Sequence, residues 1–225
     1  MRTLYNINIE EIKRKSLQLF GKMHTSSSVS YFSEFTGCNS SIGENFRFNT
    51  IATAKQLFFA IALSQSPLVD NIIDNPDENI KEIVDEMHTS KSLKGIKILD
   101  LGCGKIPVFA RCSRELGAEV YTIDIIDAEE FLFFKECFPP LQRQIEIQTH
   151  LKIDLNIENV AEEIIRFSKG HFNLVTSSFL ESGSFYESHK FICPPFNIDE
   201  IALSLLSQNS IYYKCSILDK ICIKN

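Results

Sequence analysis

The stretch IKILDLGCGKIPVFARCSRELGAEVYTID, residues 96–124, has the pattern of two strands joined by a glycine-containing turn and a helix. Its first run, IKILDL, is short and apolar, as is typical of a strand covered on both faces in a parallel sheet. VFARCSREL is predicted to be helical, and EVYTID, which ends in a carboxylate, is predicted to be the second strand. A strand, a helix and a parallel strand in this order form a right-handed βαβ unit.

The alternation of strand and helix continues along the chain. Residues 128–138 are predicted to form a helix that stops before Pro139 and Pro140. We then expect a strand over 150–155, a helix over 157–169, a strand over 172–178, a helix over 198–207 and strands within 210–225. This pattern predicts an α/β fold with a doubly wound, mostly parallel, Rossmann-like sheet. The short remainder after the fourth strand indicates an abbreviated C-terminal end, or one whose sheet edge is completed by a partner.

Residues 1–94 have a different character from residues 95–225, and we expect two regions. IATAKQLFFAIALSQ, residues 51–65, is apolar nearly all round and predicts a buried helix that packs on the sheet domain. A Ser-, Gly- and Asn-rich stretch precedes it and is expected to form a loop that acts as a lid. The prediction is a helical N-terminal cap or lid region over 1–94 and a sheet domain over 95–225.

Composition limits the classes of partner. The chain has 225 residues, 44% of them hydrophobic, and a formal net charge of -6, with lysines and arginines scattered along it. No basic face is indicated, so nucleic acid is not expected as a partner. No apolar run reaches the roughly 18 residues of a membrane span, and the N-terminus lacks the apolar core of a secretory signal. We therefore expect a cytoplasmic protein without a membrane partner.

The cysteines show no metal-ligand spacing. There are seven, they lie far apart, and they form no CxxC pair. Free thiols in a reducing compartment are expected, and no metal site is predicted. The seven are Cys38, Cys103, Cys112, Cys137, Cys193, Cys215 and Cys222.

The glycine turn between the first two predicted strands is the candidate ligand site. Gly102 and Gly104 follow the strand directly, and in an open parallel sheet ligands bind beyond the carboxyl ends of the strands. Glycine lets the chain turn tightly and a ligand approach the backbone closely, and the N–H groups of the next helix are donors for an anion. Asp124 ends the second strand, about 20 residues further on, where a carboxylate can accept both hydroxyls of a ribose. The stretch therefore predicts a nucleoside site.

The residues around the turn distinguish between nucleosides. The dinucleotide fingerprint GxGxxG requires a third glycine where this chain has Pro107, which disfavours a pyrophosphate-binding site for NAD. The turn resembles motif I of the class I S-adenosylmethionine-dependent methyltransferases, in which an acidic residue precedes a Gly-x-Gly turn, here Asp100, Gly102 and Gly104. Members of the family often have a third glycine at the position of Ile106.

The resemblance implies roles for further residues over about 95–182. The acid that binds the ribose corresponds to Asp124, and the apolar residue that packs on the adenine corresponds to Ile125. The polar residue that meets the adenine amino group corresponds to Asp154, with Leu155 beside it. The end of the fourth strand lies beside the sulfonium and the methyl acceptor in that family, and this brings in Ser177.

The resemblance implies S-adenosyl-L-methionine as cofactor and a small molecule or a protein as methyl acceptor. Cys103 is counted with the cofactor-binding residues as a small residue of the turn, since the sequence offers it no His or Asn partner as a nucleophile. No catalytic residue is identified, because methyl transfer needs alignment above all and needs a base only when the acceptor must lose a proton.

Several alternatives remain at this point. Asp154 is equally suited to capping a helix that starts near Ile157. The alternative role of Ser177 and Ser178 is to cap a helix or to close a turn. For the whole chain, the alternatives are a binding module that keeps the methyltransferase fold without catalysis and, third, an NAD-dependent oxidoreductase.

Overall fold

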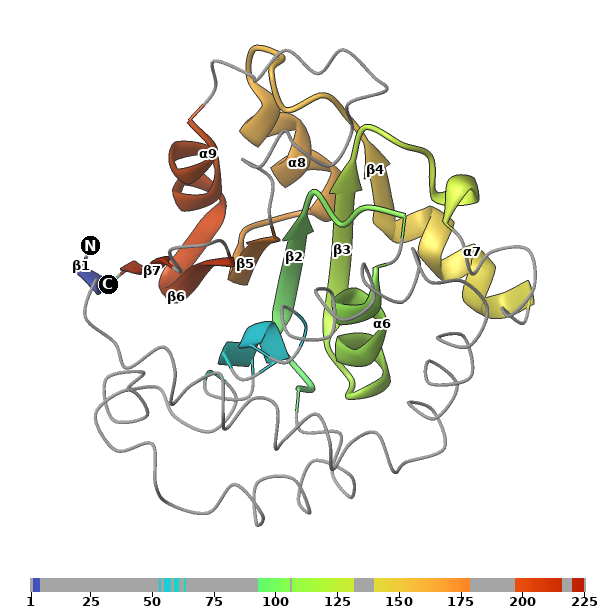
Figure 1. Ribbon diagram of the computed structural model, residues 1–225, viewed down its shortest axis with the longest axis horizontal. Coiled ribbons are helices and arrows are strands. Elements are labelled where there is room, and N and C mark those ends of the chain that lie inside the picture. The colour runs from blue at the N-terminus through green and yellow to red at the C-terminus, as the bar shows by residue number, and fades with distance from the viewer. Residues whose placement is uncertain are drawn as a thin grey trace, which may run out of the picture.

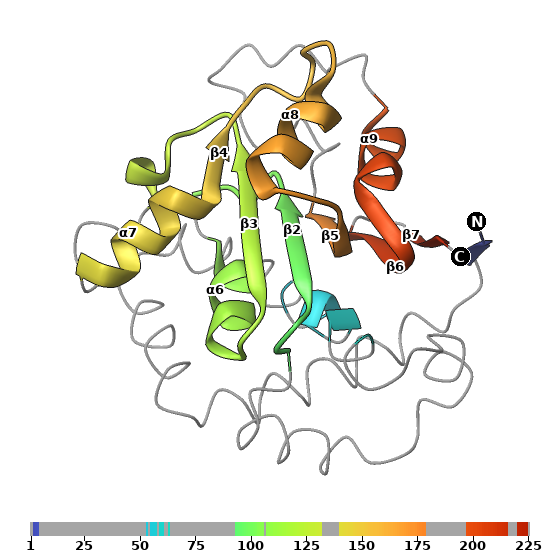
Figure 2. The ribbon, with the colours of Figure 1, turned by 180° about the vertical axis from the view of Figure 1, so that it is seen from behind.

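The computed structural model describes residues 2–4, 53, 55–57, 59, 60, 63, 93–105, 107–131, 140–178, 197–215 and 220–224. These residues form one seven-stranded sheet with helices on both faces (Figures 1 and 2). The strands are β1 (Arg2–Leu4), β2 (Lys97–Leu101), β3 (Glu119–Asp124), β4 (His150–Lys152), β5 (Phe172–Ser178), β6 (Leu206–Cys215) and β7 (Lys220–Lys224). The helices described along their whole length are α6 (Val108–Glu115), the 3-10 helix η1 (Ala128–Glu130), α7 (Pro140–Thr149), α8 (Val160–Ser168) and α9 (Ile198–Leu205).

The strand order confirms an α/β fold with a mostly parallel sheet. The order is β1-β7-β6-β5-β2-β3-β4, and the five strands from β6 to β4 are parallel neighbours. The sequence order of the strands reverses between β2 and β5, which is the switch point where doubly wound sheets bind ligands at their carboxyl ends. Asp100 pairs with Thr176 there, and Leu101 pairs with Ser177.

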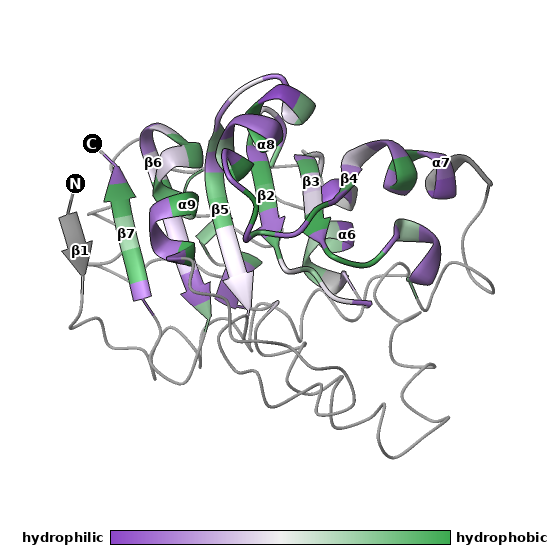
Figure 3. Ribbon diagram, turned by 90° about the horizontal axis from the view of Figure 1, so that it is seen from above, coloured by the Kyte–Doolittle hydropathy of each residue, from purple (hydrophilic) through white to green (hydrophobic). Residues whose placement is uncertain are grey.

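The far edge of the sheet is built from both ends of the chain. β7 pairs antiparallel with β6, and β1 pairs antiparallel with β7, with Arg2 opposite Ile223. The N and C marks therefore lie together at this edge (Figure 3). Residues 2–4 of the same chain supply backbone partners for β7, a pairing that the sequence did not predict. The expectation of an abbreviated C-terminal end, or one completed by a partner, stays a prediction.

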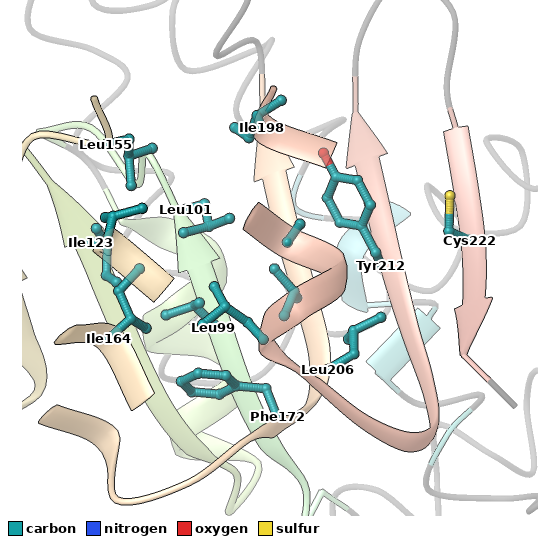
Figure 4. Packing of buried hydrophobic residues seen from close by; sticks show 14 residues of the cluster. Leu99, Leu101, Ile123, Leu155, Ile164, Phe172, Ile198, Leu206, Tyr212 and Cys222 are labelled. Carbon is teal, nitrogen blue, oxygen red and sulfur yellow. The ribbon is translucent and has the colours of Figure 1, made fainter. Parts of the chain in front are cut away.

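Helices α8 and α9 cover one face of the sheet. They enclose a core cluster in which Leu99, Ile164 and Leu205 are fully buried, and Tyr212 of β6 lies beside α9 (Figure 4). α8 buries Val160, Ile164 and Ser168 and carries its charged residues on the opposite side. Successive side chains of a strand point to opposite faces, so Asp100, between Leu99 and Leu101, faces the other layer.

That other layer contains α6 and helical residues of the N-terminal region. Among the helical positions described within 53–63, Leu57, Phe59 and Ala60 are buried, as the apolar run predicts. The Phe59 ring lies 4.5 Å from the ring of Tyr213 on β6. This segment therefore packs on the sheet. The boundary near residue 95 stays a prediction, as does the lid, whose loop lies outside the described residues.

The connection between β3 and β4 differs from the expected one. The helix predicted over 128–138 is wrong at its start, because η1 ends at Glu130 and Phe131 has an extended ψ of 128°. Residues 132–138 lie outside the described residues, so the rest of that helix stays a prediction. The helix that follows, α7, begins at Pro140, whereas the sequence predicts that Pro139 and Pro140 end a helix. Proline is favoured at the first position of a helix, where its missing N–H has no partner to lose.

Two further expectations concern cysteines and membranes. The four cysteines within the described residues, Cys103, Cys112, Cys215 and Cys222, are free thiols. Cys38, Cys137 and Cys193 lie outside those residues. Across the part of the chain that the structure describes, every helix is too short or too polar to cross a membrane.

Candidate functional site

The glycine turn between β2 and α6 is fastened to the end of β3. Gly102 has a φ of 67° and Gly104 a φ of 65°, both in the left-handed region that favours glycine. The backbone N–H groups of Gly102 and Cys103 donate to the carbonyl of Ile123, at 2.8 and 3.2 Å. The turn is therefore held over the point where β3 ends.

The space beside Gly104 is open. A Cβ built on this residue would meet nothing within 4 Å. Glycine is thus required here for its backbone conformation, and the open side leaves the turn accessible to a ligand. The helix that follows begins at Val108, with Pro107 as N-cap, and it has no side-chain cap and no acidic residue in its first turn. Its first N–H groups are donors in need of acceptors.

Asp124 holds the turn with its carboxylate. Oδ2 accepts a hydrogen bond from the backbone N–H of Gly104 at 2.8 Å, and Oδ1 accepts from the N–H of Ile125 at 2.8 Å. A longer bond of 3.4 Å reaches Oδ1 from Ile126. A carboxylate has about four acceptor positions, so Asp124 keeps capacity for a hydroxyl group. The structure thus brings the predicted ribose-binding residue against the predicted turn.

His150 fixes the segment that follows Asp124. Its Nε2 lies 2.9 Å from the carbonyl of Ile126 and its Nδ1 3.0 Å from Oγ1 of Thr122. A carbonyl only accepts, so Nε2 carries the hydrogen and Nδ1 accepts from the Thr122 hydroxyl. Burial lowers the pKa of His150, which favours this neutral form. No local pattern in the sequence marks this role, because the partners of His150 lie 24 and 28 positions away in the chain.

The residues expected to contact adenine lie in different surroundings. Ile125 is 40% exposed at the carboxyl edge, so its side chain is available to an apolar ligand face. Leu155 is buried in the core cluster, near Ile123 (Figure 4). Asp154 is exposed, and its Oδ1 accepts from the backbone N–H of Asn156 at 2.9 Å and from its side-chain amide at 2.8 Å.

The helix-cap alternative for Asp154 is wrong. α8 begins at Val160 with Asn159 as N-cap, so Asp154 closes a turn before the helix. Its expected contact with the adenine amino group stays a prediction.

Asp100 is buried on the face opposite α8 and α9. Its Oδ1 accepts from the hydroxyl of Thr176 at 3.2 Å and from the amide Nε2 of Gln56 at 3.4 Å. Burial raises the pKa of Asp100 to about 7, and the hydrogen bonds from Thr176 and Gln56 oppose the rise while the negative charge of Asp124 adds to it. A positively charged ligand group near this carboxyl would favour its ionised form.

Sequence reasoning missed Gln56 and Thr176 as neighbours of Asp100. Thr176 is a polar residue within the predicted strand 172–178, and the structure pairs it with Asp100. Gln56 was visible as a polar residue within the apolar run of residues 51–65. A polar residue in a buried helix signals a hydrogen-bond partner in another element.

The side chain of Ser177 points to the layer of α9. Its hydroxyl lies 3.1 Å from the hydroxyl of Tyr212, which donates to Oδ1 of Asp199 at 3.0 Å. Asp199 in turn accepts from Nζ of Lys220 at 2.6 Å and lies 3.5 Å from Nζ of Lys214. Ser177 is 1% exposed, so its hydroxyl belongs to this buried network, and its expected role beside the cofactor stays a prediction.

Cys103 is a protonated thiol of the turn. Its Sγ lies 3.6 Å from the carbonyl of Gly104, and its side chain packs against Ala128 and Phe131. Burial raises its pKa well above the usual value, and the carboxylates of Asp124 and Asp100 add to the rise. A thiol held neutral in this way is a poor nucleophile.

The described residues contain no cluster of His, Cys, Asp and Glu that would hold a metal ion. The site therefore consists of a glycine turn, a carboxylate that locks it, an exposed isoleucine and a buried carboxyl. No protein-family model matches the chain, and no curated protein matches it.

Proposed function

We propose that the chain is a class I S-adenosylmethionine-dependent methyltransferase. The observation that carries the proposal is the hydrogen bond between Asp124 and Gly104, beside the open side of the turn. A carboxylate with acceptor capacity next to a glycine turn at the carboxyl ends of parallel strands suits a ribose.

The described residues fit the parts of this cofactor. Asp124 would accept the ribose hydroxyls, and Ile125 would cover a face of the adenine, as its exposure allows. The uncapped first turn of α6 would meet the carboxylate of the methionine part, and Asp100 lies on the strand before the glycine turn. When bound, the cofactor supplies a methyl group activated by a sulfonium. The chain's task is to bind, align and exclude water.

The topology also supports the proposal. In the family that the glycine turn resembles, the usual ending adds a helix and an antiparallel hairpin after the parallel strands. Here β6 is parallel to β5, and the antiparallel part of the edge is formed by β7, which pairs with β6 and with β1. A complete sheet is needed to hold β5 and β6, whose carboxyl ends would flank the methyl acceptor, a small molecule or a protein.

A binding module without catalysis is the second candidate. Two side chains near the site are unsuited to reaction, because the hydroxyl of Ser177 is buried against Tyr212 and the thiol of Cys103 is held neutral. An NAD-dependent oxidoreductase is the third, and it is disfavoured by Pro107 at the place of the fingerprint glycine.

Titration calorimetry with S-adenosylhomocysteine and NAD distinguishes these proposals. We expect S-adenosylhomocysteine to bind with micromolar affinity, roughly 8 kcal/mol, and NAD to give no heat. Asp124→Asn should weaken binding, while the matched control Glu129→Gln, at an exposed carboxylate on the neighbouring η1, should not. Heat from NAD alone would overturn the proposal. Methyl transfer from the labelled cofactor to a cell extract separates the enzyme from the binding module.

A further inference from the structure

Gln56 connects the N-terminal helical segment to the floor of the candidate site. It is 2% exposed and lies between the buried Lys55 and Leu57. Its Nε2 donates to Oγ1 of Thr176 at 3.0 Å and to Oδ1 of Asp100 at 3.4 Å. A buried amide that donates to a carboxyl 44 positions away joins two parts of the chain through one polar contact.

The directions of these hydrogen bonds follow from the chemistry of the groups. An amide nitrogen only donates, so the Thr176 hydroxyl accepts from Gln56 and donates its own hydrogen to Asp100, at 3.2 Å. Gln56, Thr176 and Asp100 therefore form a closed network. Both donors converge on the same carboxyl oxygen, Oδ1.

This convergence determines which oxygen of Asp100 is left for a ligand. Because Oδ1 accepts two hydrogen bonds, the proton of the neutral carboxyl resides on Oδ2. Within the described residues, all hydrogen bonds of Asp100 go to Oδ1. Oδ2 is thus the oxygen that can release a proton and turn to a positively charged or hydrogen-donating group of a ligand.

We propose that Gln56 is a positioning residue of the ligand site, which holds Oδ1 of Asp100 and so presents Oδ2 to the ligand. The inference rests on the proposed function for the identity of that ligand. It makes the N-terminal helical segment a part of the site, with Gln56 acting through Asp100. The ligand class that suits this carboxyl is one with a positive group near its nucleoside, as a sulfonium compound with an amino group has.

The charged groups that act on Asp100 are Asp124 at the end of β3 and Arg114 on α6. Asp124 disfavours the ionised carboxyl and Arg114 favours it. From β5 and the N-terminal segment, the groups that face Asp100 are the uncharged Thr176 and Gln56. Hydrogen bonds to an ionised carboxylate lower its pKa, so loss of the Gln56 amide should raise the pKa of Asp100.

The test is a titration of the ligand-free protein with its aspartate carboxyl carbons labelled with carbon-13. The Asp100 signal is identified by its absence in Asp100→Asn. Gln56→Met, which keeps a side chain of similar length without the donor, should move the Asp100 midpoint up by about one pH unit. Leu57→Met, on the same helical segment, is the control for altered packing and should leave the midpoint in place. An unmoved midpoint in Gln56→Met would overturn the proposal.

A second measurement uses the wild-type protein and so does not depend on a variant that folds. The side-chain amide resonances of Gln56 should titrate with the same midpoint as Asp100, and this titration should vanish in Asp100→Asn. Gln56 resonances that do not respond to the Asp100 titration would also overturn the proposal.

Binding of S-adenosylhomocysteine then separates this inference from the proposed function. We expect its affinity to rise with pH through the Asp100 midpoint, and the rise to move upward in Gln56→Met together with that midpoint. If the wild-type protein does not bind S-adenosylhomocysteine but the Asp100 midpoint is shifted in Gln56→Met, the proposed cofactor is wrong. The role of Gln56 in holding Asp100 would still stand. If the pH dependence of the affinity is the same in Gln56→Met as in the wild type although the Asp100 midpoint is shifted, Gln56 has no role in ligand binding.

Discussion

The carboxylate of Asp124 accepts a hydrogen bond from the backbone N–H of Gly104 at 2.8 Å, across 20 positions of the chain. One side chain at the end of β3 thus fixes the turn at the end of β2. The same oxygen pair accepts from Ile125, the first residue after the strand. Asp124 therefore has a structural role in the ligand-free protein as well as its proposed role toward a ribose.

Substitution of Asp124 should reveal both roles. In Asp124→Ala the N–H groups of Gly104 and Ile125 lose their acceptor, and we expect the free energy of unfolding to fall by about 1–3 kcal/mol. The affinity for S-adenosylhomocysteine should fall at least tenfold, which corresponds to about 1.4 kcal/mol. Chemical denaturation and calorimetry on the same sample measure the two effects. An unchanged affinity would place the ribose elsewhere.

Gly104 and Gly95 form a matched pair for testing the turn. Both have positive φ, 65° and 87°, and a Cβ on either would meet nothing within 4 Å. Gly104→Ala and Gly95→Ala should each lower the free energy of unfolding by about 1–2 kcal/mol, because alanine is strained in this conformation. Only Gly104→Ala should weaken S-adenosylhomocysteine binding, since Gly95 lies at the opposite end of β2. Equal losses of affinity would contradict a ligand at the turn.

Much of the sheet was predictable because its signals are local. The strands at 119–124 and 172–178 match their predicted bounds, since apolar runs with adjacent turn residues mark them. α7 was missed because Pro140 is compatible with either the end or the start of a helix, and the sequence around it did not decide between them. β1 was missed because Arg2 pairs with Ile223, and no local pattern records so distant a pairing.

The candidate site was predictable where backbone and sequence spacing determine it. Gly102, Gly104 and Asp124 come together because the βαβ unit places the ends of β2 and β3 side by side. The orientations of Leu155 and Ser177 were not predictable in the same way, since they depend on which face of the sheet each residue occupies. Ser177 faces α9 and Thr176 faces Gln56, and a shift of one residue would exchange them.

Tyr212 connects Ser177 to the charged group of Asp199. Figure 4 shows its hydroxyl at the end of the ring nearest Ile198, where α9 begins. Tyr212→Phe removes the hydrogen bonds of 3.0 Å to Asp199 and 3.1 Å to Ser177. We expect a loss of about 1–3 kcal/mol in the free energy of unfolding, because the hydroxyl of Ser177 stays buried without this partner. In a double-mutant cycle, the combination of Ser177→Ala and Tyr212→Phe should destabilise the protein by less than the sum of the two single substitutions. Fully additive losses would contradict the coupling.

The ionisation of Asp100 should make the ligand-free protein less stable as the pH rises. Its pKa is about 7 in the folded chain against an ordinary 3.8, so the folded state binds the proton more tightly. The contribution to stability is complete below about 3.8 and is lost as the pH rises to about 7. The asparagine of Asp100→Asn does not titrate between pH 3.8 and about 7. The free energy of unfolding of this variant minus that of the wild type should therefore increase by roughly 1 kcal/mol per pH unit across part of this interval. Denaturation at pH 5 and pH 7.5 tests this, and a constant difference would contradict it.

His150 should act on stability in the opposite direction. Burial lowers its pKa below the ordinary 6.5, so the unfolded chain binds the proton more readily, and stability is lost as the pH falls below that value. Protonation also removes the acceptor Nδ1 that Thr122 uses, while the hydrogen bond from Nε2 to the carbonyl of Ile126 is kept.

Asp100→Asn is the suitable background for this test, because it removes the overlapping titration of Asp100. In that background we expect the free energy of unfolding to decline between pH 6.5 and pH 5, and His150→Gln to abolish the decline. Equal pH dependence with and without His150 would show that another group is responsible.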